Sequence, residues 1–361
     1  MNMLACEILT SDSEVEAIAD EWRQLYSATG TSPYSSYDWF HIWRRTTGSA
    51  YGRTLHIVTG RKDGRLVALL PLTVLKRKGF RMLQAIGGEA FYQCDMLCED
   101  PTYADVLWKA ARTSKHYDFA HIRDTAANSL CEQSMTKFAG QHHINRGPYL
   151  KIEWKTPDEW RTTLPAKLNK DLKRRMRRLE EKGPITYQVY KSWPLPEGVI
   201  ETMVAHKTAW CRQTGLDGMF DQPEVLSFCR QFAEYLAKDG TLLVSQLKCG
   251  ETPIAHQFMM VYGKRILSYI IAIDYEWSQF SPGHLSYIHT ISWAIENGFA
   301  EFDHQHGDMP HKYLFANNER ECKEFIFSNS MYGQLGAWIF LKRRKMASKS
   351  AVPQKQSAEA A

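Results

Sequence analysis

The sequence has no long hydrophobic run, no strong excess of one charge and no leader-like N-terminus. The longest apolar stretch, 66–75, contains Pro71 and Thr73, so we expect a strand there and no transmembrane helix. The first residues turn acidic at Glu7 before any basic and apolar segment, which predicts that no signal peptide is present. The net charge of +5 does not by itself indicate a nucleic-acid partner.

Cysteines are scattered, with eight in 361 residues. The one close pair, Cys94 and Cys98, is separated by three residues and has no second pair of suitable spacing, so we expect no zinc site. Scattered cysteines indicate reduced thiols, and we predict a cytoplasmic protein that binds no metal. The length fits two domains of about 150–180 residues, and a hydrophobic content of 44% is that of an ordinary globular protein.

The order of expected elements occurs twice along the chain. In the first half we predict strands at 54–59, 66–75 and 82–86, a helix at 103–111 and a strand at 119–122; in the second, strands at 242–247, 254–262 and 266–273, a helix at 284–297 and a strand at 299–303. The turn glycines Gly64 and Gly250 are 186 residues apart, and Asp118 and Asp303 are 185 apart. This repetition predicts a duplicated α/β (α+β) unit, with domains at 1–150 and 151–335 and a disordered tail at 346–361.

A short turn before the helix at 284–297 has the composition of an anion site. Ser281, Pro282 and Gly283 lead into His284, and a helix start exposes backbone N–H groups at the positive end of the helix dipole. Such an exposed helix N-terminus, called the helix mouth below, binds phosphate when no side chain covers its N–H groups. Gly283 lets a ligand approach the backbone closely. An ordinary helix start remains the alternative interpretation.

Polar, titratable residues follow the predicted strand 299–303. They are Asp303, His304, His306, His311 and Lys312. Ligands bind where strands of α/β sheets end, so this loop is a candidate site, although a solvated loop or a structural role for Asp303 is also consistent with the pattern. No Asp or Glu stands at a facial-triad spacing, so the histidines do not predict a metal.

A basic amphipathic helix is expected at 164–182. Its apolar stripe is Leu164, Leu168, Leu172, Met176 and Leu179, and its other faces carry Lys167, Lys170, Lys173, Arg174, Arg175, Arg177, Arg178 and Lys182. The cations form either a solvated face or the rim of a site for a polyanionic ligand. No interleaved stacking aromatics accompany them, so we expect no specific nucleic-acid partner. Further on, His206 and Trp210 share a predicted helix, where Trp210 serves packing at least as well as binding.

Several motifs and their order together resemble a known family. They are Trp22 and Leu25, the segment 32–36 with Trp39 and Trp43, the strand residues 69–72, the basic segment 170–180, His206 with Trp210, Gly215 and Phe220, Ser281-Pro282-Gly283, and Phe302-Asp303 with Gly307, Asp308, His311, Lys312 and Phe315. Over residues 15–330 this order resembles the CelD/BcsL (BioF2-like) acetyltransferase family of the GNAT superfamily, which is related to the FemABX peptidyltransferases.

The resemblance implies tandem GNAT-like domains, each a mixed, mainly antiparallel sheet flanked by helices, with a degenerate N-terminal half. It implies acetyl-CoA or another acyl-CoA as donor and a small-molecule or sugar acceptor, with polysaccharide or envelope biosynthesis as the expected pathway. The donor's pyrophosphate is then expected at Ser281, Pro282, Gly283 and His284. Lys312, His206, Trp210 and Arg174 are expected to contact substrate, and Asp303, Tyr287 and His304 are the candidates for proton transfer.

Two alternatives stay open because the usual glycine-rich GNAT phosphate loop is reduced here to Gly283. A Fem-like transferase would take its amino acid from charged tRNA, and the basic helix would then contact RNA. A non-catalytic accessory protein of exopolysaccharide assembly would keep the fold without turnover. We predict the acyl-CoA enzyme, in which backbone N–H groups of the strand 266–273 stabilise the oxyanion.

Overall fold

The computed structural model describes residues 4–30, 32–50, 52–87, 95–215, 218–307 and 309–350, which form two compact units. The first unit comprises residues up to Arg146 together with Arg320–Ser350, and the second comprises Gly147–Glu319. The predicted boundary at 150/151 falls four residues after this division, and the segment 320–335, which the sequence analysis places in the second half, is part of the first unit. Cys94 and Asp308 lie outside the described residues.

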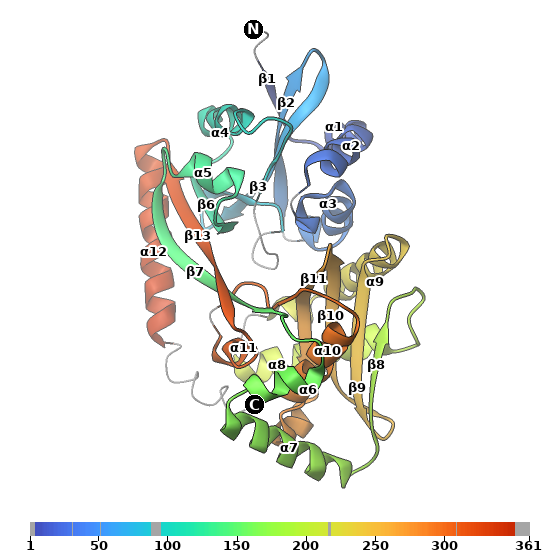
Figure 1. Ribbon diagram of the computed structural model, residues 1–361. Coiled ribbons are helices and arrows are strands. Elements are labelled where there is room, and N and C mark those ends of the chain that lie inside the picture. The colour runs from blue at the N-terminus through green and yellow to red at the C-terminus, as the bar shows by residue number, and fades with distance from the viewer. Residues whose placement is uncertain are drawn as a thin grey trace. The chain divides into compact units, whose positions relative to one another are not determined.

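The first unit is a sheet with helices packed on it (Figure 1). Its elements are β1 (Ala5–Leu9), α1 (Asp12–Ala17), α2 (Ala19–Thr29), η1 (Pro33–Ser35), α3 (Tyr37–Trp43), η2 (Arg44–Gly48), β2 (Arg53–Lys62), β3 (Arg65–Arg77), β4 (Phe80–Ala85), β5 (Leu97–Cys98), α4 (Tyr103–Thr113), β6 (Phe119–Ala126), α5 (Leu130–Met135), β13 (Asn318–Ser328) and α12 (Met331–Ser350). Strand order is β1-β2-β3-β4-β6-β13. Because α12 continues through Ser350, the first five residues of the predicted tail are helical.

The second unit has the same design. Its elements are α6 (Pro157–Thr163), α7 (Ala166–Glu180), β8 (Ile185–Tyr190), α8 (Val199–Thr214), η4 (Gly218–Asp221), α9 (Pro223–Lys238), β9 (Leu242–Cys249), β10 (Thr252–Tyr262), β11 (Arg265–Ile273), η5 (Tyr275–Phe280), α10 (Pro282–Glu296), β12 (Glu301–Asp303) and α11 (Pro310–Tyr313). Strand order is β12-β11-β10-β9-β8, and the end of β7 (Gly140–Lys151) pairs with β12.

The predicted duplication is visible in the strand pairing. β2, β3 and β4 run antiparallel in sequence order, then α4 crosses over and β6 pairs parallel with β4. β9, β10 and β11 repeat that arrangement, α10 makes the crossover, and β12 pairs parallel with β11. The predicted fold class, tandem units with mixed, mainly antiparallel sheets flanked by helices, is therefore confirmed.

Alternation of side chains divides the second unit's core into two faces. Met259 of β10 belongs to the cluster that includes Leu285 and Ile291 of α10, whereas its neighbour Phe258 stacks on Phe232 of α9. One face of the sheet is thus covered by α10 and the other by α9, as expected for a strand that is buried on both faces. The burial of α10 on this sheet fixes where its N-terminus lies.

The helix prediction at 164–182 needs correction at its ends, because α7 spans Ala166–Glu180. The helix expected at 164–182 begins at Ala166, because the residue before a proline is extended, and Leu164 has that conformation before Pro165. Leu164 is still buried, as the C-terminal cap of α6. In the described ranges, no helix is long and apolar enough to cross a bilayer.

Candidate functional site

The N-terminus of α10 is held open by an unusual cap. Ser281 occupies the cap position with φ +50°, and its hydroxyl makes no capping bond to the helix backbone. It accepts a hydrogen bond from the Arg175 guanidinium instead, at 2.6 Å. The first N–H groups of α10 are therefore not capped by a side chain, and this is the arrangement that receives anions.

Gly283 lies where the first turn of α10 meets β11. A Cβ at this position would lie 3.4 Å from Ile273 and 3.8 Å from Ile271, which is ordinary contact distance. An alanine side chain therefore fits against β11, but a large side chain would have to extend across the helix mouth. The glycine leaves the mouth clear, as the sequence analysis expects.

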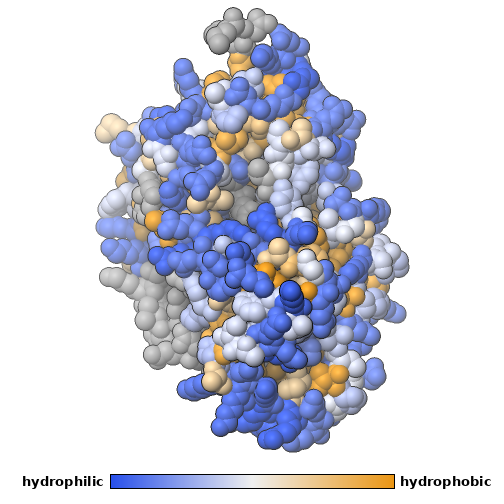
Figure 2. Space-filling view, viewed as in Figure 1, coloured by the Kyte–Doolittle hydropathy of each residue, from blue (hydrophilic) through white to orange (hydrophobic). Residues whose placement is uncertain are grey.

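Arg175 is the residue of α7 that reaches this mouth. Besides Ser281, it donates to the carbonyl of Gln279 at 3.0 Å and to Asp171 at 2.7 Å. Its neighbour Arg174, which is predicted from the sequence to bind substrate, is mostly exposed and pairs with Asp171. The rest of the outer surface of α7 is hydrophilic and solvated (Figure 2).

Basic side chains from four helices act on one another around the α10 mouth. They are Arg175 of α7, Lys207 of α8, His284 of α10, and His311 and Lys312 of α11. Burial and then the charge of Arg175 lower the pKa of His284 to about 4. Burial and then Lys312, His284 and Lys207 lower the pKa of His311 to about 4. Both imidazoles are therefore neutral near pH 7, and the positive field beside them is free to attract an anion.

Lys207 is a cation without a carboxylate. Its ammonium lies 4.2 Å from the ring centre of Trp210 and 5.9 Å from that of Phe220, and no ion pair of it occurs among the described residues. Burial lowers the pKa of Lys207. The predicted binding residue Trp210 thus acts here as a platform for Lys207.

His206, the other binding residue predicted on α8, faces the end of β11. Its Nε2 lies 3.9 Å from a carboxylate oxygen of Asp274, and its ring centre is 5.5 Å from that of His256. Burial lowers the pKa of His206, and Asp274 opposes this shift. With Lys207, His206 is therefore the second titratable residue of α8 described here, and it lies beside the end of β11.

A β-bulge interrupts β11 next to the α10 mouth. Phe258 of β10 pairs with Ile270, but the next residue, Met259, pairs with Ser268, so that Tyr269 is an extra residue in β11. Ile266 before the bulge and Ile271 after it both pack with α10 although they are five residues apart. The bulge therefore reverses the alternation of β11 and turns its backbone at 268–270.

β11 also extends past its neighbour. Its pairing with β12 ends at Leu267 opposite Asp303, whereas β11 continues to Ile273. In the described part of the chain, no strand pairs with that edge of β11 beyond Leu267. β12 ends at Asp303, so among the described residues this edge of β11 has no paired strand beside the bulge.

The loop after β12 is tightly organised by its own residues. Asp303 accepts a hydrogen bond from the backbone N–H of Gln305 at 2.7 Å. The ammonium of Lys312 donates to the carbonyl of His306 at 2.7 Å and approaches that of Gln305 at 3.4 Å. Gly307, with φ +116°, makes room for it, because a Cβ there would lie 3.3 Å from Nζ. Lys312 thus stabilises the loop after β12 through these backbone carbonyls.

His304 and Tyr287 lie together in an aromatic cluster. Their ring centres are 4.9 Å apart, and Phe302 and Phe315 complete the packing. Burial and then the charge of Lys312 lower the pKa of His304 to about 3. His304 is thus a neutral, weakly basic imidazole, and Tyr287 is 2% exposed. Both positions have a packing role, and proton transfer by either stays a prediction.

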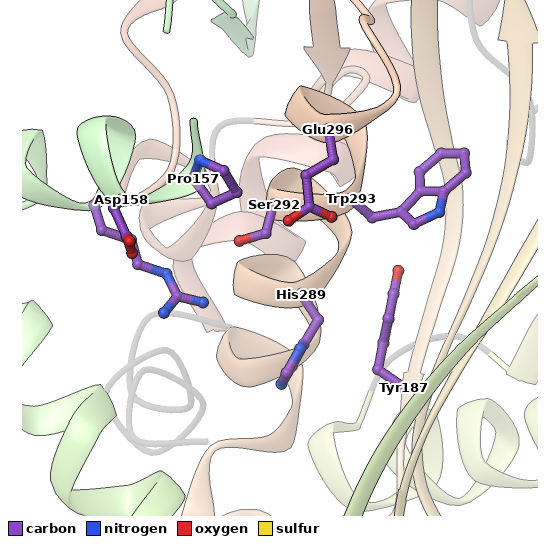
Figure 3. Close-up of a pocket in the computed structure, with 8 residues that line it drawn as sticks. Pro157, Asp158, Tyr187, His289, Ser292, Trp293 and Glu296 are labelled. Atoms are coloured by element: carbon purple, nitrogen blue, oxygen red, sulfur yellow. The ribbon is translucent and has the colours of Figure 1, made fainter. Parts of the chain in front are cut away.

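A pocket of about 370 Å³ lies at the other end of α10 (Figure 3). It is lined by Pro157, Asp158, Arg161, Tyr187, His289, Ser292, Trp293 and Glu296. None of these is a residue selected by the sequence analysis, and the helix mouth with its basic side chains lies at the opposite end of α10. In the described residues no group of three His, Cys, Asp or Glu side chains is arranged to hold a metal ion.

The structure brings Ser281, Pro282, Gly283 and His284 together with one cation that the sequence analysis did not select, Arg175. The signal was present, because Arg175 lies three residues after Leu172 and four before Leu179, on the buried stripe of α7. On α8 the sequence predicts His206 as a binding residue, whereas the cation of this helix is its neighbour Lys207. No sequence signal marked the bulge at Tyr269.

A comparison with protein families finds a match within the second unit. Residues 166–313 match the family described as an acetyltransferase (GNAT) domain. No curated protein matches the sequence. The matched range contains the α10 mouth, the bulge and the unpaired edge of β11, so the second unit is similar to a GNAT acetyltransferase domain.

Solved structures extend the similarity over both units. FemX superposes with a TM-score of 0.57 at 11% identity, covering 86% of this chain and 96% of that chain. The C-terminal domain of a putative lysylphosphatidylglycerol synthetase from Agrobacterium fabrum gives 0.56 at 11% identity, covering 90% and 95%. A conserved protein of unknown function from Bacteroides thetaiotaomicron gives 0.52 at 12% identity, covering 89% and 100%. At these identities the similarity is one of fold.

Proposed function

We propose that the chain is an acyl-CoA-dependent transferase of the CelD/BcsL type, which moves an acyl group to an amine or hydroxyl of a small molecule or sugar in polysaccharide or envelope biosynthesis. The observation that carries the proposal is the uncapped mouth of α10, which Gly283 leaves clear and beside which Arg175 donates a hydrogen bond to Ser281. A polyphosphate needs such a combination of backbone N–H groups and positive field. The residues present therefore fit the donor.

Acyl-CoA supplies a thioester, whose acyl carbon forms a bond to the acceptor's nitrogen or oxygen while the C–S bond breaks. The N–H groups at the α10 mouth and the side chain of Lys207 bind the phosphates. The edge of β11 beyond Leu267 holds the donor's amide-containing arm by backbone hydrogen bonds, in the manner of an added strand. This places the reacting carbonyl next to the bulge.

The backbone at 268–270 is the proposed source of the oxyanion contact, since the bulge turns its N–H groups out of the regular ladder. Asp303 or His304 accepts the acceptor's proton, and Tyr287 returns one to the leaving thiolate. His304 is a weak base, because burial and the charge of Lys312 lower its pKa to about 3. Lys312 contacts substrate in this scheme only after exchanging the carbonyl of His306 for a substrate oxygen.

The proposal is tested by release of free thiol from acetyl-CoA and longer acyl-CoAs, measured with a panel of amines, amino sugars and sugars. Acceptor-dependent thiol release is expected. The same panel supplied with aminoacyl-tRNA tests the Fem-like alternative, which the fold of FemX and the cations of α7 favour. Transfer from tRNA alone, steeply reduced by salt, would replace our proposal with that one. Neither activity, together with no coenzyme binding, would indicate the accessory protein.

Two adjacent arginines of α7 give a matched pair of variants. Arg175→Ala removes the bonds to Ser281 and to the carbonyl of Gln279, and we expect the KM for acyl-CoA to rise about tenfold, as for loss of a charge-assisted hydrogen bond of about 1.4 kcal/mol. Arg174→Ala removes a similar charge without touching the mouth, and its KM should stay within about twofold of the wild type. If both variants raise the KM equally, Arg175 acts only through its positive charge and not through its hydrogen bonds at the α10 mouth.

A further inference from the structure

The C-terminal helix α12 is docked on the first unit by one well-defined face. A Cβ on Gly333 would overlap the carbonyl oxygen of Asp118, and one on Gly336 would lie 2.6 Å from the ring of Phe80. Ala337 is buried, and Phe340 packs against Phe119 with ring centres 5.9 Å apart. The small residues thus let the helix backbone lie directly on the sheet, and its rotation about its own axis is fixed.

An ion pair holds the same face further along the helix. Arg344 pairs with Glu324 of β13, which is completely buried and also accepts a hydrogen bond from His121 at 2.8 Å. Arg344 lies four residues after Phe340 and eleven after Gly333, on the same side of the helix. The opposite side must therefore face outward over the whole described length.

That outward side is apolar. Met331, Leu335, Trp338 and Met346 are 86%, 50%, 53% and 69% exposed. Their spacings of four, three and eight residues place them on one stripe, opposite Gly333, Ala337 and Phe340. Proteins seldom expose several large apolar side chains together on one helix to water. The stripe therefore has the character of an interaction surface for an apolar partner.

The charges on α12 all have one sign. The helix contains Lys342, Arg343, Arg344, Lys345 and Lys349 and no Asp or Glu. Lys342 lies on the apolar stripe itself, with its ammonium 4.1 Å from the ring centre of Trp338. Neither Lys342 nor Arg343 forms an ion pair among the described residues, in contrast to Arg344. An apolar stripe that carries cations and an exposed tryptophan is complementary to a layered surface, in which negatively charged groups cover an apolar interior.

We propose that the outer face of α12 binds the surface of a membrane that contains anionic lipids. Met331, Leu335 and Trp338 enter the boundary between headgroups and acyl chains, and the cations that follow contact lipid phosphates. A second copy of the chain fits less well, because the outer faces of two α12 helices would bring together Lys342 and Arg343 of each copy with no carboxylate of α12 to pair with them. This attachment is independent of the proposed transfer chemistry, and its residues belong to the first unit.

The test is co-sedimentation of the full chain with vesicles made of equal parts phosphatidylglycerol and phosphatidylcholine. We expect the wild type to sediment with these vesicles, to bind vesicles of phosphatidylcholine alone at least tenfold more weakly, and to be released by salt. Leu335→Glu with Trp338→Glu should reduce binding at least tenfold. Lys342→Glu with Arg343→Glu, which leaves the apolar stripe intact, should do the same on the mixed vesicles.

The matched control is Val106→Glu with Ile144→Glu, which alters two exposed apolar residues elsewhere in the first unit and should leave binding unchanged. Circular dichroism melting establishes that each variant is folded, as expected for changes at exposed positions. The proposal is overturned if the folded wild type stays in the supernatant with mixed vesicles. It is also overturned if Leu335→Glu with Trp338→Glu abolishes self-association in the ultracentrifuge and leaves vesicle binding intact, because the face would then cover a second copy.

Discussion

The variant Gly283→Trp is expected to lose acyl transfer by at least a hundredfold and to lose stabilisation by acetyl-CoA. Its side chain has no room against Ile273, which would lie 3.4 Å from the first added carbon, and therefore extends over the N–H groups of α10. A hundredfold loss corresponds to about 2.7 kcal/mol, the usual effect of removing a preorganised anion contact. The measurements are thiol release and thermal shift against acetyl-CoA concentration.

Gly283→Ala is the control that separates obstruction from loss of backbone freedom. Alanine fits at contact distance from Ile273 and Ile271, and the position does not have a positive φ. Melting temperature, transfer and acetyl-CoA stabilisation should therefore all stay close to those of the wild type. A similar loss in both variants would mean that the region needs a flexible backbone rather than an open mouth.

The variant Glu324→Ala is expected to destabilise the first unit by about 3 kcal/mol, which is typical when one partner of a buried ion pair is removed. The carboxylate is completely buried between His121 and Arg344, and its loss leaves both without their partner. Glu321→Ala, on the same strand but exposed, is the control and should change stability by less than about 0.5 kcal/mol. Urea unfolding of the two variants makes the comparison, and equal midpoints would contradict the role given to Glu324.

The same pair predicts how stability depends on pH. Burial alone would raise the pKa of Glu324, but the hydrogen bonds from His121 and Arg344 outweigh it and lower the pKa to about 2. A carboxyl group with a lowered pKa contributes stability above its ordinary value, near 4.5, and loses that contribution as pH falls towards 2. Burial lowers the pKa of His121 as well, so protonation of the unfolded chain adds to the loss on acidification below about 6.5. Glu324→Ala should show a flatter stability profile between pH 5 and about 2, and an unchanged slope would argue against the pair.

The second unit's framework could be predicted from the sequence because each element carries its own signal. Strands β9, β10 and β11, helix α10 and strand β12 lie within two residues of the expected ends, since apolar runs, turn glycines and Pro282 mark them. The α10 mouth could be predicted for the same reason, because Ser281, Pro282 and Gly283 are adjacent in the chain.

The remaining features depend on contacts between distant segments. Arg175 rather than Arg174 reaches Ser281 because of the rotation of α7, which is set by packing of Leu172 and Leu179. The bulge at Tyr269 follows from its pairing with β10, and no local residue type requires it. Likewise, β13 and α12 belong to the first unit through contacts with Asp118 and Phe119, which are distant from them in sequence.

The central claim is that the mouth of α10 binds the phosphates of acyl-CoA, and calorimetric titration of the wild-type chain with acetyl-CoA tests it most directly. The account predicts saturable binding at one site per chain, weakened about tenfold by Arg175→Ala and unaffected by Arg174→Ala. Absence of binding for acetyl-CoA and for longer acyl-CoAs, with the protein folded and the concentrations in the millimolar range, would contradict it.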